Sequence, residues 1–337
     1  MTGVPGGSGS VGCLLGSPGV RVLVTNDDGV SAPGLAALTR ALVGWADASA
    51  AAGGPSHQIV VVAPSSNFSG AGAAVGSVTD GTKIPYRRER VSGAEGVDAF
   101  GLDASPALSV IAGALGAVGP KPDLVLSGIN HGVNVGRSVL HSGTVGAALT
   151  ASQLGISALA VSLRSGSTPE PWESAADLAI ALIPLLTRAP ARTVLNLNVP
   201  ALPLHQILGV RWARVSGAGL IKAARGDSDG AAEGEFEGEF EAPNPPEMEG
   251  PAAAEGARAF MEGEPGDKGE IVLSVGSPFP GGDDLGLADQ SEDATLVAQG
   301  YAALTALRGP RADEDVALFR LLDAGLAAAI APLGLAG

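Results

Sequence analysis

The chain has 337 residues, enough for one large domain or two small ones. Hydrophobic residues make up 45% of it and aromatic residues only 4%, which predicts a core of alanine, valine and leucine. Its formal net charge is −15, but residues 227–270 hold 14 acidic residues against Arg258 and Lys268, so −12 of this charge lies in one segment. Because the remainder is nearly neutral and has no cluster of Lys or Arg, the composition excludes a nucleic-acid-binding surface.

The N-terminal segment and the single cysteine bear on location. Residues 1–19 are rich in glycine and serine and lack the basic and apolar regions of a secretory signal, so we expect a flexible extension. Cys13 cannot form an internal disulfide, which is typical of a reducing compartment. No apolar run reaches the roughly 18 residues of a membrane-spanning helix. We therefore expect a soluble, cytoplasmic protein with no membrane attachment.

Strand-like and helix-like segments alternate through the first two thirds of the chain. Short runs that are apolar on both faces, as in strands buried between two layers of helices, occur at residues 21–25, 59–64, 123–128, 158–163 and 194–199. Segments with helical spacing and breakers at their ends occur at residues 33–45, 105–118, 143–155 and 171–189. This alternation predicts an α/β fold, with a mainly parallel sheet and helices on both faces.

The character of the sequence changes in the last third of the chain. Residues 207–217 and 270–278 are expected as strands on either side of an acidic segment rich in glycine and proline. That low-complexity segment, residues 227–268, is expected to be a solvent-exposed and poorly ordered insertion, because its few apolar residues gain too little burial to offset chain ordering. A last strand is expected at residues 300–307 and a terminal helix at residues 314–333.

Polar side chains follow three of the expected strands, at the points where these strands end. Asn26, Asp27 and Asp28 follow the first strand. Residues 65–70 follow the second, and residues 127–136 follow the third. Ligands of open α/β sheets bind beyond the carboxyl ends of the strands, so we expect the three clusters to converge in one crevice. Their oxygens suit Mg²⁺, Mn²⁺ or Ca²⁺ better than structural zinc.

Each of these residues also has a plainer interpretation. An Asp-Asp pair is usually a turn or a helix cap, and the same dipeptide at Asp283-Asp284, in a Pro/Gly loop, is assigned no role. Ser69 alone is a turn residue, and Asn130 alone is a turn or cap residue. A dinucleotide site is a further alternative, but the first turn lacks G-x-G-x-x-G, and its two carboxylates would repel a pyrophosphate unless a cation bridged them.

Five segments, taken in order, resemble the stationary-phase survival protein (SurE) family of metal-dependent 5′-nucleotidases. They are VLVTNDDGVSAPGLAALTRAL, VVAPSSNFSGAG, PDLVLSGINHGVNVG, HSGTVGAALTASQLGISALAVSL and LNLNVPALPLHQILGVRWARV. The resemblance covers residues 20–217, the expected catalytic core, and DATLVAQGYAALTAL at residues 293–307 is similar to the family's C-terminal segment. The chain is therefore divided into the extension, this core, a variable region at residues 218–292, and a C-terminal strand and helix at residues 293–337.

The resemblance implies a Rossmann-like core and a smaller, β-containing C-terminal part that reaches across to a partner subunit, giving a homodimer or homotetramer. It implies removal of phosphate from nucleoside 5′- and 3′-monophosphates, with one divalent cation per subunit, Mg²⁺ or Mn²⁺. The implied metal ligands are Asp27, Asp28, Ser69 and Asn130, and the first two are also the expected catalytic residues. The expected substrate and phosphate contacts are at Asn26, Gly132, Asn134, Gly136, Ser142, Gly143 and Thr144.

Roles within this reaction stay open in part. Asp27 is either the base that activates water or the nucleophile that attacks phosphorus. His141 is a candidate general acid, at a position where the family often has tyrosine, and His131 is expected to be a loop residue only. Ser142 or Thr144 is expected to cap a helix, which is compatible with phosphate binding at the helix N-terminus.

The chain departs from the family pattern in three places, of which the altered residues 65–72 support an alternative function. Residues 65–72 lack the acidic and basic residues that the family often has there, residues 218–292 match poorly, and the family's G-Y-V-S-x-T-P is replaced by GYAALTA at residues 300–306. The alternative is a degenerate nucleotide-binding sensor that keeps the ligands and has lost turnover. A haloacid-dehalogenase phosphatase is disfavoured, because it would carry D-x-D where Asp27 and Asp28 are adjacent.

Overall fold

The structure is a computed structural model. It describes residues 19–217, 221–226, 270–275, 279, 289–309, 325–326, 329 and 331–334. The chain divides into two compact units, residues 1–217 with 279–337 and residues 218–278, and each is described by itself. The expected extension, apart from Gly19, and the expected insertion at residues 227–268 lie outside the described residues, as does most of the expected terminal helix.

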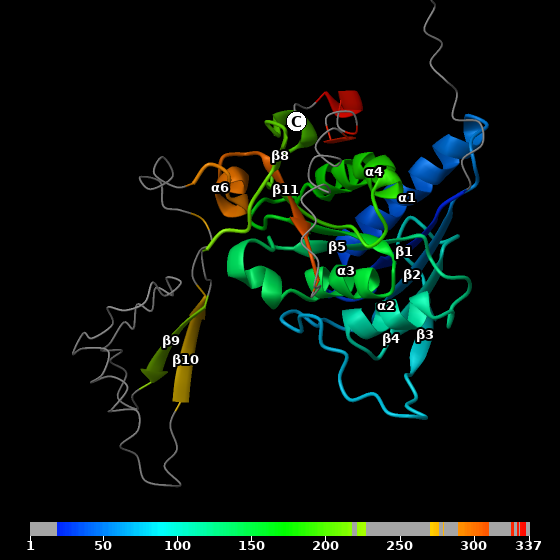
Figure 1. The fold of residues 1–337 in the computed structure, drawn as a ribbon, viewed down its shortest axis with the longest axis horizontal. Helices are drawn as coiled ribbons and strands as arrows, with labels where there is room; N and C mark the ends of the chain where they lie inside the picture. The colour runs from blue at the N-terminus through cyan, green and yellow to red at the C-terminus, as the bar shows by residue number, and fades with distance from the viewer. Residues whose placement is uncertain are drawn as a thin grey trace, which may run out of the picture. The chain divides into compact units, whose positions relative to one another are not determined.

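A nine-stranded sheet forms the centre of the first unit, with its strands in the order β3-β4-β2-β1-β5-β6-β7-β11-β8 (Figure 1). The six strands from β4 to β7 in this order are parallel, whereas β3 and β11 pair antiparallel with β4 and β7. The bounds are β1 Arg21–Thr25, β2 Gln58–Pro64, β3 Tyr86–Glu89, β4 Asp98–Leu102, β5 Leu124–His131, β6 Ser157–Leu163, β7 Val194–Val199, β8 Val210–Trp212 and β11 Ala302–Leu307. The predicted α/β fold with a mainly parallel sheet is confirmed.

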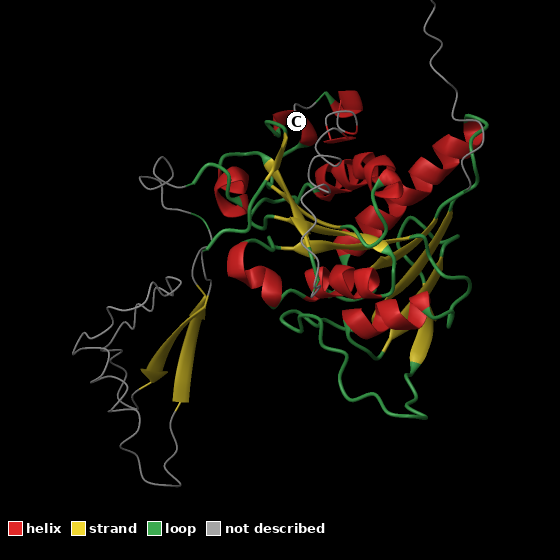
Figure 2. Cartoon of the chain, in the orientation of Figure 1, coloured by secondary structure: helices red, strands yellow, loops and turns green. Residues whose placement is uncertain are grey.

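Helices cover both faces of this sheet (Figure 2). Helices α1 (Pro33–Ala51) and α4 (Trp172–Arg188) pack on one face, and α2 (Pro106–Ala114) and α3 (Gly143–Gln153) pack on the other. The two cores explain why the strands are apolar throughout: Val22 faces the α1 and α4 layer, whereas Leu23 faces the α2 and α3 layer. None of the described helices is long and apolar enough to cross a bilayer.

Side-chain caps fix where two of these helices begin. The hydroxyl of Ser105 accepts a hydrogen bond from the N–H of Leu108 at 3.2 Å and starts α2. The hydroxyl of Ser142 accepts from the N–H of Val145 at 3.0 Å and starts α3. Of the two N-caps considered for this helix, the structure selects Ser142, which leaves the Thr144 hydroxyl to another partner.

The C-terminal segment returns to the main sheet. Helix α6 (Asp293–Ala298) leads into β11, which lies between β7 and β8. Leu304 of β11 is fully buried and is in register with Leu197 of β7 and Trp212 of β8. The last strand predicted from the sequence is therefore present, and it is an internal strand of the sheet. The 3₁₀ helices are η1 Gly136–Leu140, η2 Leu204–Gln206 and η3 Ala331–Leu333.

In the second unit, β9 (Ile221–Gly226) and β10 (Glu270–Val275) form a two-stranded antiparallel sheet. Strand β10 was expected, and β9 was not. In the first unit β3 and β4 were also missed. Strand β3 is exposed and charged and therefore lacks the apolar pattern of a buried strand, whereas β4 is a short buried strand. Strand β8 is shorter than the predicted strand at residues 207–217.

The substitution Leu304→Ala tests the burial of β11. We expect the free energy of unfolding to fall by about 2–5 kcal/mol, because a fully buried leucine side chain is removed from a strand with neighbours on both sides. Leu208→Ala is the matched control, since Leu208 is 57% exposed, and its effect should stay within about 0.5 kcal/mol. Urea unfolding measures both, and equal effects would contradict this position of β11.

Candidate active site

The carboxyl ends of β2, β1 and β5 lie side by side, because these three strands are adjacent and parallel. The N–H of Phe68, after β2, donates a hydrogen bond to the carbonyl of Asp27 at 2.7 Å. The N–H of His131, at the end of β5, donates to Oδ2 of Asp28 at 3.1 Å. The segments that carry the three polar clusters therefore converge at one edge of the sheet.

Asp27 lies against the start of α3 and is only 2% exposed. Its Oδ1 accepts a hydrogen bond from the Thr144 hydroxyl. Gly143 permits this approach, since a Cβ there would lie 2.7 Å from Asp27 Cβ and 2.8 Å from Oδ2. Burial raises the pKa of the Asp27 carboxyl, the Thr144 hydrogen bond lowers it and the charge of Asp28 raises it, and the net pKa is raised. The first turn of α3 therefore does not fully stabilise the ionised Asp27 carboxylate, which needs further positive charge nearby.

Asp28 and Asn130 face this edge from neighbouring segments. Burial raises the pKa of Asp28, and the hydrogen bond from the N–H of His131 offsets only part of the increase. The Nδ2 of Asn130 donates to the carbonyl of Gly132 at 2.7 Å, which sets the orientation of the side-chain amide. The carbonyl oxygen of that amide then points away from Gly132.

These three side chains fit a hard divalent cation. Hydrogen bonds engage Oδ1 of Asp27, Oδ2 of Asp28 and Nδ2 of Asn130, so the second polar atom of each side chain, an oxygen, is left for a ligand. Two carboxylates and an amide oxygen are ligands that Mg²⁺, Mn²⁺ and Ca²⁺ accept. In the described part of the chain no three His, Cys, Asp or Glu side chains cluster, so a cation here would need neutral oxygens as well.

Ser69 and Asn26 lie in the segments around these three side chains. Ser69 is exposed, and its N–H donates to Oδ1 of Asn67 at 2.7 Å. Asn26 is fully buried, and its Nδ2 donates to the carbonyl of Gly29 at 2.8 Å. The Asn26 Oδ1 is buried without a hydrogen-bond partner. Asn26 thus shapes the turn after β1, and Ser69 is accessible to a ligand.

The loop after β5 differs from the expectation. The N–H of Gly132 donates to a carbonyl of β6 at 2.8 Å, and the N–H of Asn134 donates to Oδ1 of Asn198 at 2.7 Å. The N–H of Gly136 donates to the carboxylate of Asp293, at 3.1 Å from Oδ2. The backbone amides expected to cradle phosphate are therefore directed at acceptors within the protein. The start of α3 is what remains of the expected phosphate cradle.

The two histidines near this edge have different surroundings. The carbonyl of His141 accepts from the N–H of Gly72 at 3.0 Å, and the residue itself is exposed. The ring of His131 lies 3.2 Å from the carboxylate of Glu170, and its centroid lies 5.8 Å from that of Trp172. The His131 side chain is thus held by the segment before α4.

A group of buried polar side chains on β6 and β7 was not predicted from the sequence. The carbonyl of Asn134 accepts from Nδ2 of Asn196 at 2.9 Å and of Asn198 at 3.0 Å, and Nδ2 of Asn134 donates to the Ser162 hydroxyl at 2.8 Å. Asp293 was missed as well. A signal was present in the sequence, because two asparagines at alternate positions of an apolar strand lie on one face of it.

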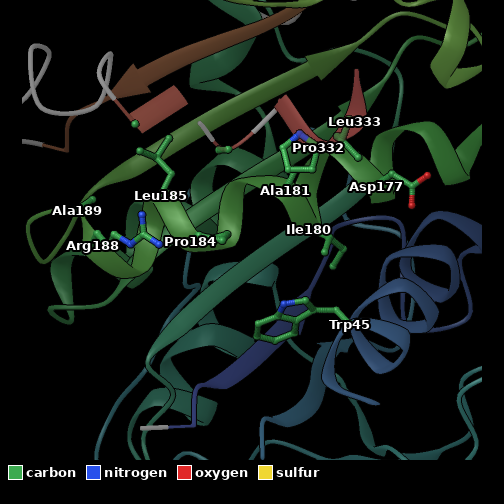
Figure 3. A pocket seen from close by; sticks show the side chains of 12 residues that line it. Trp45, Asp177, Ile180, Ala181, Pro184, Leu185, Arg188, Ala189, Pro332 and Leu333 are labelled. Atoms are coloured by element: carbon green, nitrogen blue, oxygen red, sulfur yellow. The ribbon is translucent and has the colours of Figure 1, made fainter. Parts of the chain in front are cut away.

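An apolar cavity of about 540 Å³ lies elsewhere, between α1, α4 and C-terminal residues (Figure 3). Trp45, Ile180 and Leu185 contribute to its lining, together with Asp177 and Arg188. None of its 12 lining residues belongs to the group around the adjacent carboxylates. The chemistry of the side chains, and not cavity volume, therefore marks the candidate active site.

Comparison with known proteins decides the family. The family described as Survival protein SurE matches residues 22–220. The chain belongs to the SurE family. It is 38% identical over 197 residues to the 5′/3′-nucleotidase SurE of Cronobacter sakazakii, which covers 58% of this chain and 69% of that protein. It is 41% identical over 198 residues to the 5′-nucleotidase SurE of Pseudomonas putida, which covers 58% of this chain and 71% of that protein.

A solved structure of a SurE protein, from Aquifex aeolicus, has a similar fold. The TM-score is 0.57 at 24% identity, and the match covers 90% of this chain and 97% of that chain. At this level of identity, the structural similarity supports the fold and nothing further. Together, the SurE family match and this fold confirm the family resemblance and the fold class predicted from the sequence.

The substitution Gly143→Ala tests the close packing of α3 against Asp27. The added Cβ would overlap Asp27 Cβ and Oδ2, so we expect the free energy of unfolding to fall by about 1–3 kcal/mol. Gly44→Ala in α1 is the matched control, because nothing lies within 4 Å of a Cβ there, and it should raise the free energy of unfolding by up to about 1 kcal/mol. Urea unfolding in EDTA compares the two. Equal stabilisation by both substitutions would show that Gly143 does not lie against Asp27.

Proposed function

We propose that this SurE-family chain is a metal-dependent phosphomonoesterase that removes phosphate from nucleoside 5′- and 3′-monophosphates. The observation that carries the proposal is the meeting of Asp27, Asp28 and Asn130 at one edge of the sheet, each with an oxygen left for a ligand. The relatives named 5′/3′-nucleotidase and 5′-nucleotidase SurE support the substrate class.

Asp27, Asp28 and Asn130 would hold one divalent cation, Mg²⁺ or Mn²⁺, with the exposed Ser69 as a fourth ligand. The raised pKa values of the two carboxyls support this, because buried carboxylates that resist ionisation gain most from a neighbouring cation. When bound, such a cation polarises a phosphoryl oxygen and lowers the pKa of its water.

The start of α3 is the proposed phosphate position. The first N–H groups of a helix have no partner within the helix, and this terminus favours anions. Ser142 caps the helix through the N–H of Val145, and Gly143 and Thr144 form the first turn beside Asp27. Asn26, with the loop at residues 132–136, shapes the surrounding turns. An anion-binding helix terminus beside carboxylates that would hold a cation suits a phosphate group as the ligand.

Asp27 has two proposed roles that are chemically distinct. In one role the Asp27 carboxylate accepts a proton from the attacking water, and in the other it attacks phosphorus and does not serve as a metal ligand through the same oxygen; Thr144 donates to Oδ1 in the structure. In the second case an acyl phosphate forms on Asp27, and the departing nucleoside oxygen takes up a proton, for which His141 is a candidate donor. Acid quenching during turnover of ³²P-labelled AMP would retain label on the protein only in the second case.

A nucleotide-binding sensor without turnover is the second candidate function. Residues 65–72, next to the proposed ligand Ser69, are mostly exposed and carry no charged side chain. Phosphate release from AMP in the presence of Mn²⁺, measured with malachite green, separates the two functions. The homodimer or homotetramer and the cytoplasmic location stay predictions, the first of which light scattering would measure.

The substitution Asp28→Asn tests the proposed ligand set through activity. EDTA should abolish AMP hydrolysis by the wild type, and Mn²⁺ or Mg²⁺ should restore it. Asp28→Asn should lower kcat/KM by about 10²-fold or more, because an anionic ligand is lost where charge stabilises the transition state. Asp47→Asn, at an exposed carboxylate of α1, is the control and should retain full activity. Normal AMP hydrolysis by Asp28→Asn would refute the metal site.

The same substitution should act on stability in the opposite direction when metal is absent. The pKa of Asp28 is raised in the folded state, so the ionised carboxyl opposes folding at neutral pH and its protonation favours folding. In EDTA, Asp28→Asn removes that cost, and Tm should rise by about 2–4 °C for each kcal/mol relieved. In Mn²⁺ the wild type gains binding energy and should melt higher than the variant. A structural cap or salt bridge predicts a lower Tm under both conditions.

A further inference from the structure

The loop that follows β5 is held at alternate residues by partners far away in sequence. The N–H of Gly132 donates to β6, that of Asn134 to Asn198 on β7, and that of Gly136 to Asp293 in α6. Neither end of the loop can shift without breaking one of these hydrogen bonds, and the bonds at Asn134 and Gly136 are buried. Such bonds are costly to break, because the freed groups lie away from water.

Asp293 is the anchor that accepts backbone hydrogen bonds with both of its carboxylate oxygens. It is fully buried, and its Oδ1 accepts from the N–H groups of Ser216 at 3.0 Å and Ala294 at 2.8 Å. The N–H of Gly136 donates to Oδ2 at 3.1 Å and lies 3.3 Å from Oδ1. Both oxygens therefore act as acceptors, and an amide side chain at this position would place an N–H₂ group against a backbone donor. Among the described residues no Lys, Arg or His forms an ion pair with Asp293.

Asn198 is the matching anchor on the opposite side of the loop. Its Oδ1 accepts from the N–H of Asn134 at 2.7 Å, and its Nδ2 donates to the carbonyl of the same residue at 3.0 Å. One buried side chain thus satisfies both backbone groups of Asn134, as a neighbouring strand would. Asn198 also lies in register with Ser162, which is itself in register with Asn130 on β5.

The loop in turn sets the orientation of Asn130. The Nδ2 of Asn130 donates to the carbonyl of Gly132 at 2.7 Å, so the position of that carbonyl decides where Oδ1 points. We propose that Asp293 and Asn198 are positioning residues for the reaction: by clamping the loop at residues 132–136, they keep Oδ1 of Asn130 facing the carboxylates of Asp27 and Asp28. This inference rests on the proposed metal site. The C-terminal segment would then help to position a proposed metal ligand, although the proposed metal ligands all lie in the first half of the chain.

A structural role alone is distinguishable from this clamp. If Asp293 only stabilised the fold, its loss would lower Tm and leave the Mn²⁺ affinity of the folded protein unchanged. With a clamp, loss of Asp293 lowers both Tm and the Mn²⁺ affinity. Substituting the residues that hold metal ligands in place typically changes metal affinity by about 10–100-fold. Coupling is reciprocal, so Mn²⁺ must also stabilise the clamp in the wild type.

The test compares Asp293→Asn with the matched control Asp289→Asn, an exposed carboxylate in the same segment that pairs with Arg214 at 3.6 Å. Mn²⁺ binding to the metal-free full-length chain is measured by electron paramagnetic resonance, below the Tm of each variant. We expect Asp293→Asn to weaken Mn²⁺ binding by about tenfold or more. Asp289→Asn should stay within twofold, and the Mn²⁺ concentration for half-maximal AMP hydrolysis should shift by the same factors.

Two further measurements test the inference even if Asp293→Asn fails to fold. Asn198→Ser removes the other side of the clamp and should weaken Mn²⁺ binding in the same direction. In the wild type, Mn²⁺ should slow hydrogen exchange at the N–H groups of Gly136 and Ser216, the two donors to Asp293 from outside its own helix. Unchanged Mn²⁺ affinity in the folded variants, or unchanged exchange at these amides, would overturn the inference while leaving the proposed function intact. A wild type that neither binds Mn²⁺ nor hydrolyses AMP would refute both.

Discussion

Burial of the Asp27 carboxylate under the first turn of α3 is the constraint on which the rest of the site depends. A side chain that is 2% exposed cannot be hydrated, and an ionised group without water needs compensating charge or hydrogen bonds. The hydroxyl of Thr144 and the helix terminus supply part of this. The requirement explains the glycine at position 143 and the end-on approach of α3. At the proposed metal site, protons and metal ions would compete for the same oxygens, so metal affinity is expected to fall as pH falls.

The convergence of the three polar clusters at one edge of the sheet follows from general rules, and this is why it could be predicted from the sequence. Strands that are apolar on both faces belong to a parallel sheet, and the carboxyl ends of parallel strands share one edge. Asp27, Asp28 and Asn130 had to meet if β1 and β5 were neighbours, whatever the distances turned out to be. The prediction needed only that β1 and β5 be neighbours, because each cluster follows its own strand directly.

The supports of the site could not be predicted in the same way. Asp293 and Asn198 contact the loop after β5 only because β7 and α6 are brought beside it, and no spacing in the sequence encodes those contacts. The glycines of this loop indicated phosphate binding, yet their N–H groups have acceptors within the protein. Local composition cannot tell a free backbone donor from one that a distant side chain has already satisfied. The edge strand β3 escaped detection for a related reason, since an exposed strand needs no apolar pattern.

The place of β11 between β7 and β8 also determines when the sheet can be completed during synthesis on the ribosome. Residues 1–217 emerge first and contain eight of the nine strands of this sheet, but β7 then has an open edge, and β8 pairs within the sheet only through β11. An open edge on a buried, apolar strand is a template for pairing with other chains. The nascent protein therefore carries its greatest risk of aggregation after β7 has folded and before residues 302–307 have left the exit tunnel.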